Sequence, residues 1–201
     1  MKDITPKGLT FSKTELVDLL KAWVAITIAF SIARATMMGS FEEFMMSFIV
    51  SAVVVGAAFL LHELAHKYMA IKYRCAAEFR ANNSMLLMMM FVSLMGVILA
   101  APGAVQIRGH LSRKEHGMVS LAGPGVNLAL AAVSIPVAII FSGSVLGILG
   151  TYSAFINSWL GMFNLIPFGM FDGRKILVWN REVYYTALVM GFVMVGISQF
   201  L

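Results

Sequence analysis

Two histidines and a glutamate within five consecutive positions are the residues of this chain best suited to chemistry. His62, Glu63 and His66 lie in the stretch Leu61-His62-Glu63-Leu64-Ala65-His66. On a helix, side chains four residues apart project from the same face, so both imidazoles can reach one zinc ion at about 2.0–2.1 Å. Glu63 can reach the space beside that ion and accept a proton from a water molecule that the metal acidifies. The spacing therefore predicts a hydrolytic zinc site.

A hydrolytic zinc site usually has three protein ligands and an open position for water, so a third ligand is expected elsewhere in the chain. Asp172 is the acidic residue attached directly to a late apolar segment. Pro167 and Gly169 before it would break a helix and let the backbone bend toward the metal. Asp172 could instead cap a helix that starts at Gly173, but its position favours the ligand. The remaining acidic candidates lie at the far end of an apolar run or in basic loops, namely Glu42, Glu43, Glu78, Glu115 and Glu182.

The composition indicates that these residues belong to a membrane protein. Of the 201 residues, 60% are hydrophobic and only 12% are charged, and the mean hydropathy is +0.86. A soluble domain of this size needs more charge to cover its surface. The net charge of +5 could indicate a nucleic-acid partner, but the basic residues lie at the ends of apolar runs, as in membrane proteins. We therefore expect a lipid bilayer and no nucleic acid as partner, and the single cysteine, Cys75, excludes an intramolecular disulfide.

The membrane setting also weighs against a merely structural role for His62, Glu63 and His66. Chance polar residues are readily satisfied inside a soluble helix bundle. In the centre of a membrane, by contrast, each ionisable group costs about 2.5–3.5 kcal/mol on insertion scales. Three such groups within five positions need a compensating partner, and a metal ion provides one.

Apolar runs of about 20 residues, the length that crosses a bilayer, predict an all-α polytopic membrane protein. We expect about five transmembrane helices, with a re-entrant or strand-containing segment between the second and the third. Residues 1–201 are expected to form one membrane-embedded domain around the predicted zinc site, with its catalytic core at about 44–178. The expected spans are 19–38, 44–73, 119–141, 145–167 and 183–201.

The apolar stretch from Met85 to Val105 is predicted to enter the membrane and to leave it on the same side. Hydropathy alone predicts a full span, but the positive charges oppose it. If the segment re-enters, 14 of the 15 Lys and Arg residues lie on the inner side and only Arg34 lies outside; if it crosses, 8 lie inside and 7 outside. The preference of Lys and Arg for the inner side favours re-entry, and Gly96, Pro102 and Gly103 offer places to turn.

Two short segments that flank this stretch, Ala77 to Arg80 and Val105 to Arg108, are candidates for strands. If the predicted zinc site cuts peptide bonds within a membrane, a helical substrate must unwind first, because a peptide bond in an intact helix is shielded by its hydrogen bonds. Substrate segments rich in Gly, Pro or Asn are therefore favoured. The two strands could hold the unwound substrate by strand addition.

Three motifs, in this order along the chain, resemble those of the site-2 protease family of intramembrane zinc metalloproteases. They are His62-Glu63-Leu64-Ala65-His66, Gly123-Pro124-Gly125-Val126-Asn127 and Asn164-Leu165-Ile166-Pro167-Phe168-Gly169-Met170-Phe171-Asp172-Gly173. The resemblance covers about residues 55–178. Two positions depart from the usual pattern: Ala65 stands where glycine is frequent, and Arg174 stands where a second glycine often follows. The chain has no room for the PDZ or CBS domains that many members carry.

The resemblance implies that His62, His66 and Asp172 bind Zn2+ and that Glu63 is the catalytic base. The implied enzyme is a zinc endopeptidase that hydrolyses a peptide bond within or near a transmembrane segment of a membrane protein, as in regulated intramembrane proteolysis. The resemblance also places Asn127 near the scissile bond as a second catalytic residue, where its amide would hold the substrate backbone or the developing oxyanion. A buried asparagine could equally tie helices together.

Three other functions share part of this pattern. A membrane metalloprotease of the prenyl-protein-processing type also has the two-histidine motif, but its third ligand is usually a downstream glutamate rather than an aspartate such as Asp172. A metal transporter would repeat polar residues across several spans, whereas this chain has a single cluster. An inactive relative that only binds membrane proteins would be expected to lack Glu63 or a ligand.

No targeting segment is visible, which makes a prokaryotic plasma membrane the expected location, with the N-terminus and the active-site side in the cytoplasm. The sequence predicts neither the identity of the substrate nor the oligomeric state.

Overall fold

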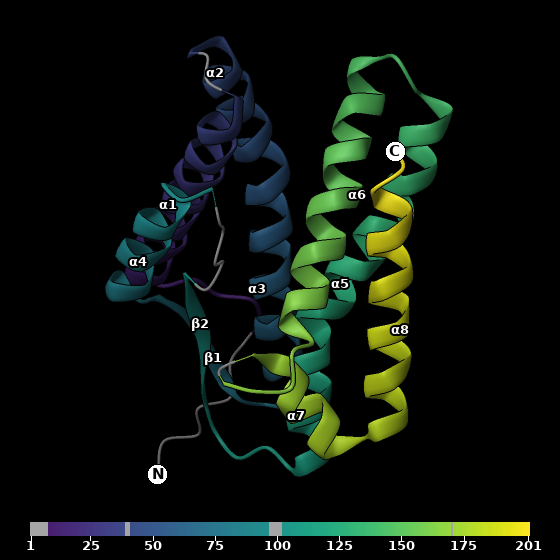
Figure 1. Ribbon diagram of the computed structural model, residues 1–201. Coiled ribbons are helices and arrows are strands. Elements are labelled where there is room, and N and C mark those ends of the chain that lie inside the picture. Colours follow the sequence, from purple (N-terminus) through teal and green to yellow (C-terminus); the bar gives the residue numbers. More distant parts are fainter. Residues whose placement is uncertain (1–7, 39–40, 97–101, 170) are drawn as a thin grey trace.

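The computed structural model describes residues 8–38, 41–96, 102–169 and 171–201 (Figure 1). Its elements are α1 (Lys13–Met38), α2 (Phe41–Val50), the π-helical turn η1 (Ser51–Val55), α3 (Gly56–Lys72), β1 (Ala76–Ala81), α4 (Asn83–Ser93), β2 (Gly103–Arg108), α5 (Arg113–Ile140), α6 (Val145–Asn164), α7 (Asp172–Trp179) and α8 (Arg181–Ser198).

Within the described residues, four helices are long and apolar enough to cross a membrane. They occupy Lys13–Arg34, Phe44–Lys72, Arg113–Ile140 and Val145–Asn164. The fifth predicted span forms α8, which opens with Arg181 and Glu182 and is not among those four. The predicted all-α polytopic membrane fold is thus confirmed.

The second span is a single rod in which α2, η1 and α3 follow one another without leaving helical backbone angles. The wider π turn frees the carbonyl oxygen of Ala52, which accepts a hydrogen bond from the Trp23 indole of α1 at 2.9 Å. Trp23 lies so close to α3 that a Cβ at Gly56 would stand 1.9 Å from its indole nitrogen. The absence of a side chain at Gly56 therefore lets α1 dock against the helix that carries both histidines.

The helices form two groups beside α3 (Figure 1). Helices α1 and α4 pack together on one side of it, whereas α5, α6 and α8 form the other side. Helices α5 and α6 are joined by a tight turn, and the Ser144 hydroxyl caps α6 by accepting from the amide of Gly147 at 3.2 Å. Helix α7, the start of α5 and the end of α3 gather at the lower end of the view, so distant parts of the sequence meet there.

Strands β1 and β2 form the one sheet in the described residues, and they confirm the two predicted strands. They pair antiparallel from Ala76 opposite Arg108 to Ala81 opposite Gly103. The segment between them contains α4, which has only 11 residues and is too short to cross a bilayer. Because the segment starts and ends at paired residues, it returns to the level at which it left. This geometry agrees with the predicted re-entry; residues 97–101 of the predicted segment lie outside the described residues.

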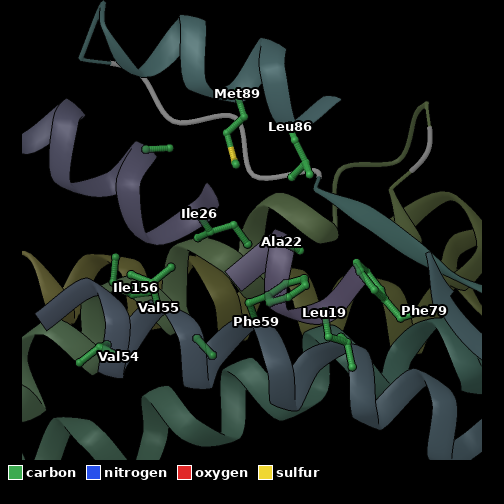
Figure 2. Close-up of a cluster of buried hydrophobic side chains, with 12 residues drawn as sticks. Leu19, Ala22, Ile26, Val54, Val55, Phe59, Phe79, Leu86, Met89 and Ile156 are labelled. Atoms are coloured by element: carbon green, nitrogen blue, oxygen red, sulfur yellow. The ribbon is translucent and has the colours of Figure 1, made fainter. Parts of the chain in front are cut away.

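A hydrophobic cluster fixes the sheet and α4 against α1 and α3 (Figure 2). Phe59 of α3 and Phe79 of β1 are 4% and 1% exposed, and Leu86 and Met89 of α4 face the same cluster. In a membrane, where lipid is as apolar as these side chains, such packing stabilises through close van der Waals contact. The sheet is therefore held firmly beside the helix that carries the histidines.

Candidate metal centre

Helix α3 presents His62, Glu63 and His66 toward the interior of the protein, and all three are buried. The two histidines are one helical turn apart, and their Nε2 atoms are 3.0 Å from each other. The predicted convergence of the two imidazoles is therefore present in the structure.

Asp172 joins the two histidines from the other end of the sequence. Its Oδ2 atom lies 3.1 Å from Nε2 of His66 and 3.8 Å from Nε2 of His62. Ligands at about 2.0–2.1 Å from a tetrahedral zinc ion lie roughly 3.3 Å from one another, and the three observed separations bracket that value. The described residues contain this set of three as a group that could hold a metal ion.

The alternative role of Asp172 as a helix cap does not match the structure. Asp172 is the first residue of α7, the N-cap is Phe171, and this end of the helix has no side-chain cap hydrogen bond. Instead, Oδ1 of Asp172 accepts a hydrogen bond from Nζ of Lys175 at 3.3 Å, which leaves Oδ2 facing the histidines. Lys175 also lines a hollow of about 480 Å³ between α7 and the start of α5.

The outer nitrogens of both histidines are held by partners that fix where the protons are. Nδ1 of His66 lies 2.8 Å from the carbonyl oxygen of Val119, and Nδ1 of His62 lies 2.5 Å from Oδ1 of Asn127. Both partners are acceptors, so each Nδ1 carries a hydrogen, and in the neutral imidazole that binds a metal this leaves the lone pair on Nε2. Two lone pairs and a carboxylate oxygen thus face one another, and a cation between them relieves their repulsion. The arrangement fits zinc, whose histidine ligands are commonly oriented in this way.

Gly123 of α5 leaves the room that this arrangement needs. A Cβ atom at this position would stand 2.3 Å from Nε2 of His66 and 2.6 Å from Nε2 of His62. Any side chain at position 123 would therefore push the ligand atoms apart. Gly123 belongs to the second motif of the sequence, but its contact with the ligands could not be predicted from the sequence.

Asn127 is fully buried, and its amide already has three partners. Its oxygen accepts from His62, while its nitrogen donates to the carbonyl of Ala58 at 3.2 Å and to Oδ1 of Asn157 at 2.9 Å. These contacts link α5 to α3 and α6, which is the helix-tying role considered for a buried asparagine. A direct catalytic role of Asn127 stays a prediction. Val119 and Asn157 were not predicted as parts of the site, because a backbone carbonyl and a distant asparagine leave no motif in the sequence.

Glu63 stands between the two histidines in sequence but outside the set of ligands. Its Oε2 atom is buried and has no hydrogen-bond partner among the described residues. A buried carboxylate oxygen without a donor is costly, and it is suited to receive a proton from a water molecule in the site. This position agrees with the base role predicted for Glu63.

Comparison with known proteins gives one informative relative. The chain is 36% identical over 189 residues to a protein of Methanocaldococcus jannaschii named "Putative zinc metalloprotease MJ0611", and the match covers 92% of this chain and 93% of that protein. No protein-family model and no solved structure matches the chain.

Proposed function

The chain belongs to the zinc metalloprotease family of this archaeal relative, and we propose that it is an intramembrane member, of the site-2 protease type, that cuts a peptide bond within or near a transmembrane segment of a membrane protein. The observation that carries the proposal is the convergence of His62, His66 and Asp172 beside Glu63, with both histidines inside an apolar span. A protease of the prenyl-protein type would be expected to use a glutamate where the cluster has Asp172.

The depth of the ligands supports cleavage inside the membrane. His66 and His62 lie six and ten residues before Lys72, the last residue of α3. At about 1.5 Å per residue, the ligands are roughly 9 and 15 Å from that end of the span. The hydrocarbon core is about 30 Å thick, so both positions fall within it if Lys72 marks its boundary.

The proposed reaction is hydrolysis with Glu63 as the base. A bound zinc ion would polarise the peptide carbonyl and acidify water. Glu63 accepts a proton from the attacking water as its oxygen bonds to the carbonyl carbon, and it passes that proton to the departing amine nitrogen when the C–N bond breaks. Asn127 and Val119 hold the imidazole rings of His62 and His66 in place during these steps.

We further propose that the unwound substrate adds to the outer edge of β2. The amide of Phe79 in β1 points away from β2, toward Glu15, so Phe79 and Val105 are a pair without mutual hydrogen bonds. Val105 therefore turns its N–H and C=O to the outer edge of β2, and Ile107, two residues on, does the same. Neither has a hydrogen-bond partner for these groups among the described residues. An extended peptide could pair with them.

Substitution of Glu63 by glutamine tests the proposal. The change keeps the size of the side chain and removes the base, so the Glu63→Gln variant should retain zinc and lose activity by at least about 10²–10⁴-fold. The measurement is cleavage of a transmembrane substrate reconstituted with the protein in vesicles, together with the zinc content of each preparation. Cleavage by the variant at close to the wild-type rate would show that another group activates the water.

We also propose that the N-terminus and the active-site end face the cytoplasm. Single cysteines near Asn82 and near His110 should then react with an impermeant thiol reagent from the cytoplasmic side. The experiment uses a Cys75→Ala background. Cys75 is the single cysteine of the sequence, so its replacement leaves only the introduced cysteine to react. Labelling of the two positions from opposite sides would contradict this orientation and the re-entry of the segment between them.

A further inference from the structure

A second buried polar cluster lies beside the metal centre and joins three parts of the chain. It consists of Glu15 from α1, Lys67 from α3 and the backbone of Phe79 in β1. Nζ of Lys67 is 2.5 Å from Oε2 of Glu15, and Oε1 of Glu15 accepts from the amide of Phe79 at 3.0 Å. Lys67 and Glu15 are only 2% and 1% exposed. Lys67 also donates to the carbonyl oxygen of Thr10 at 2.5 Å, so the segment before α1 is held as well.

Phe79 is attached to α3 a second time through its ring. The rings of Phe79 and Phe59 meet edge to face, with their centroids 5.5 Å apart and their planes at 77°, inside the hydrophobic cluster of Figure 2. Phe59, Glu63 and Lys67 follow one another at intervals of four residues, so they lie in one row on the surface of α3. The two attachments of Phe79 are therefore one turn before and one turn after the proposed catalytic base.

Polar attachment fixes a position more sharply than apolar packing does. Both carboxylate oxygens of Glu15 are engaged, one by Lys67 and one by Phe79. If β1 moved along α3 by one residue, the amide of Phe79 would leave its acceptor, and a buried oxygen would be left without a donor. Because Phe79 stands opposite Val105, a sheet fixed at Phe79 also fixes β2.

We propose that Glu15 and Lys67 are positioning residues that set the sheet along α3 and so determine which peptide bond of the substrate reaches the metal centre. This inference rests on the proposed function, in which the substrate adds to the outer edge of β2. The carboxylate of Glu15 also occupies the centre of the outer edge of β1, which leaves β2 as the edge for the substrate.

The test compares two double variants that leave no buried charge behind. Glu15→Ala/Lys67→Met removes the ion pair and the acceptor for the Phe79 amide, whereas Glu15→Gln/Lys67→Met removes the charges but keeps an acceptor oxygen. The matched control is Lys21→Met, because Lys21 lies on α1, the helix of Glu15, is about half exposed and pairs with Asp18 at 3.5 Å. Each protein is reconstituted with a transmembrane substrate, and the bonds that it cuts are mapped by mass spectrometry.

The wild type, Lys21→Met and Glu15→Gln/Lys67→Met should cut one principal bond. Glu15→Ala/Lys67→Met should spread cleavage to bonds about two residues away, since a slip by two keeps the same strand faces in contact. Its zinc content should be unchanged, and the amides of 76–81 should exchange hydrogen for deuterium faster than in the control. Cleavage at the wild-type bond alone, at any rate, would overturn the inference. Failure of the wild type to cut any transmembrane substrate would overturn the proposed function itself, and the inference with it.

Discussion

The two buried polar clusters of this protein are neighbours on α3, but they balance their charges in different ways. At Lys67, a cation from the chain meets the carboxylate of Glu15. At His66, the preceding residue, lone pairs of two imidazoles face an oxygen of Asp172. Lys175 pairs with the other oxygen of that carboxylate at 3.3 Å.

This difference indicates that the Lys67–Glu15 pair is a structural contact, whereas the three ligands form a binding site. A buried ion pair is complete in itself, and its two partners hold their elements together whatever else is bound. A set of converging acceptors is incomplete until an ion from outside supplies the positive charge. Each of the following substitutions tests that distinction.

The largest effect is expected from His66→Ala. This change removes one of three ligands, so purified protein should lose its zinc and all metal-dependent cleavage. Elemental analysis gives the zinc content per chain, which we expect to be one ion in the wild type. His116→Ala serves as a control, because this histidine of α5 is not a member of the ligand group. Unchanged zinc in the His66 variant would contradict the ligand assignment.

Lys67→Met should destabilise the fold without removing a ligand. The carboxylate of Glu15 would remain buried without its counter-ion, which costs about 3–5 kcal/mol of the free energy of unfolding. Glu15→Gln/Lys67→Met should recover most of that loss, since no charge is left behind. Lys21→Met should change the free energy of unfolding by about 0–1 kcal/mol, as expected for an exposed pair. Denaturant unfolding in detergent micelles measures all three, and equal effects of the two lysine substitutions would refute the distinction.

Of the three substitutions, Asn127→Ala should have the smallest effect. The imidazole of His62 would lose the partner that orients it, which should weaken zinc binding by about 10–100-fold rather than abolish it. Competition with a chelator of known affinity measures the change. Asn164→Ala is a matched control, because the amide nitrogen of Asn164 donates to Leu160 of its own helix. Wild-type affinity in the Asn127 variant would show that this contact does not support the metal.

Much of the fold could be predicted from hydropathy, because a bilayer demands long apolar runs and the chain supplies them. The stretch from Met85 to Val105 shows the limit of that signal: it carries no charge, yet its described residues include most of the 11-residue α4 and the start of β2. The count of positive charges favoured re-entry, and the short helix between two paired strands agrees with it.

The site could be predicted where the spacing of its residues along the sequence indicates their role. His62 and His66 are related by one helical turn, and Asp172 was singled out by the broken apolar segment before it; the structure brings all three together. The contacts of Val119, Asn157 and Gly123 could not be predicted, because they depend on how α5 and α6 pack against α3. The ion pair between Lys67 and Glu15 was also not predicted. Ser12 and Glu15 have the spacing of a local helix cap, and the amide of Glu15 does bond to the Ser12 hydroxyl, but the carboxylate of Glu15 bonds to Lys67 and Phe79.

The order of the ligands along the chain has a consequence for biosynthesis. The two histidines are made early, on α3, whereas Asp172 follows only after α5 and α6 have been made. A chain still emerging from the ribosome holds two ligands, and two do not form a hydrolytic zinc site. We therefore expect a nascent molecule to be inert toward neighbouring membrane proteins, and toward other copies of itself, until α7 has folded against the helices inserted before it.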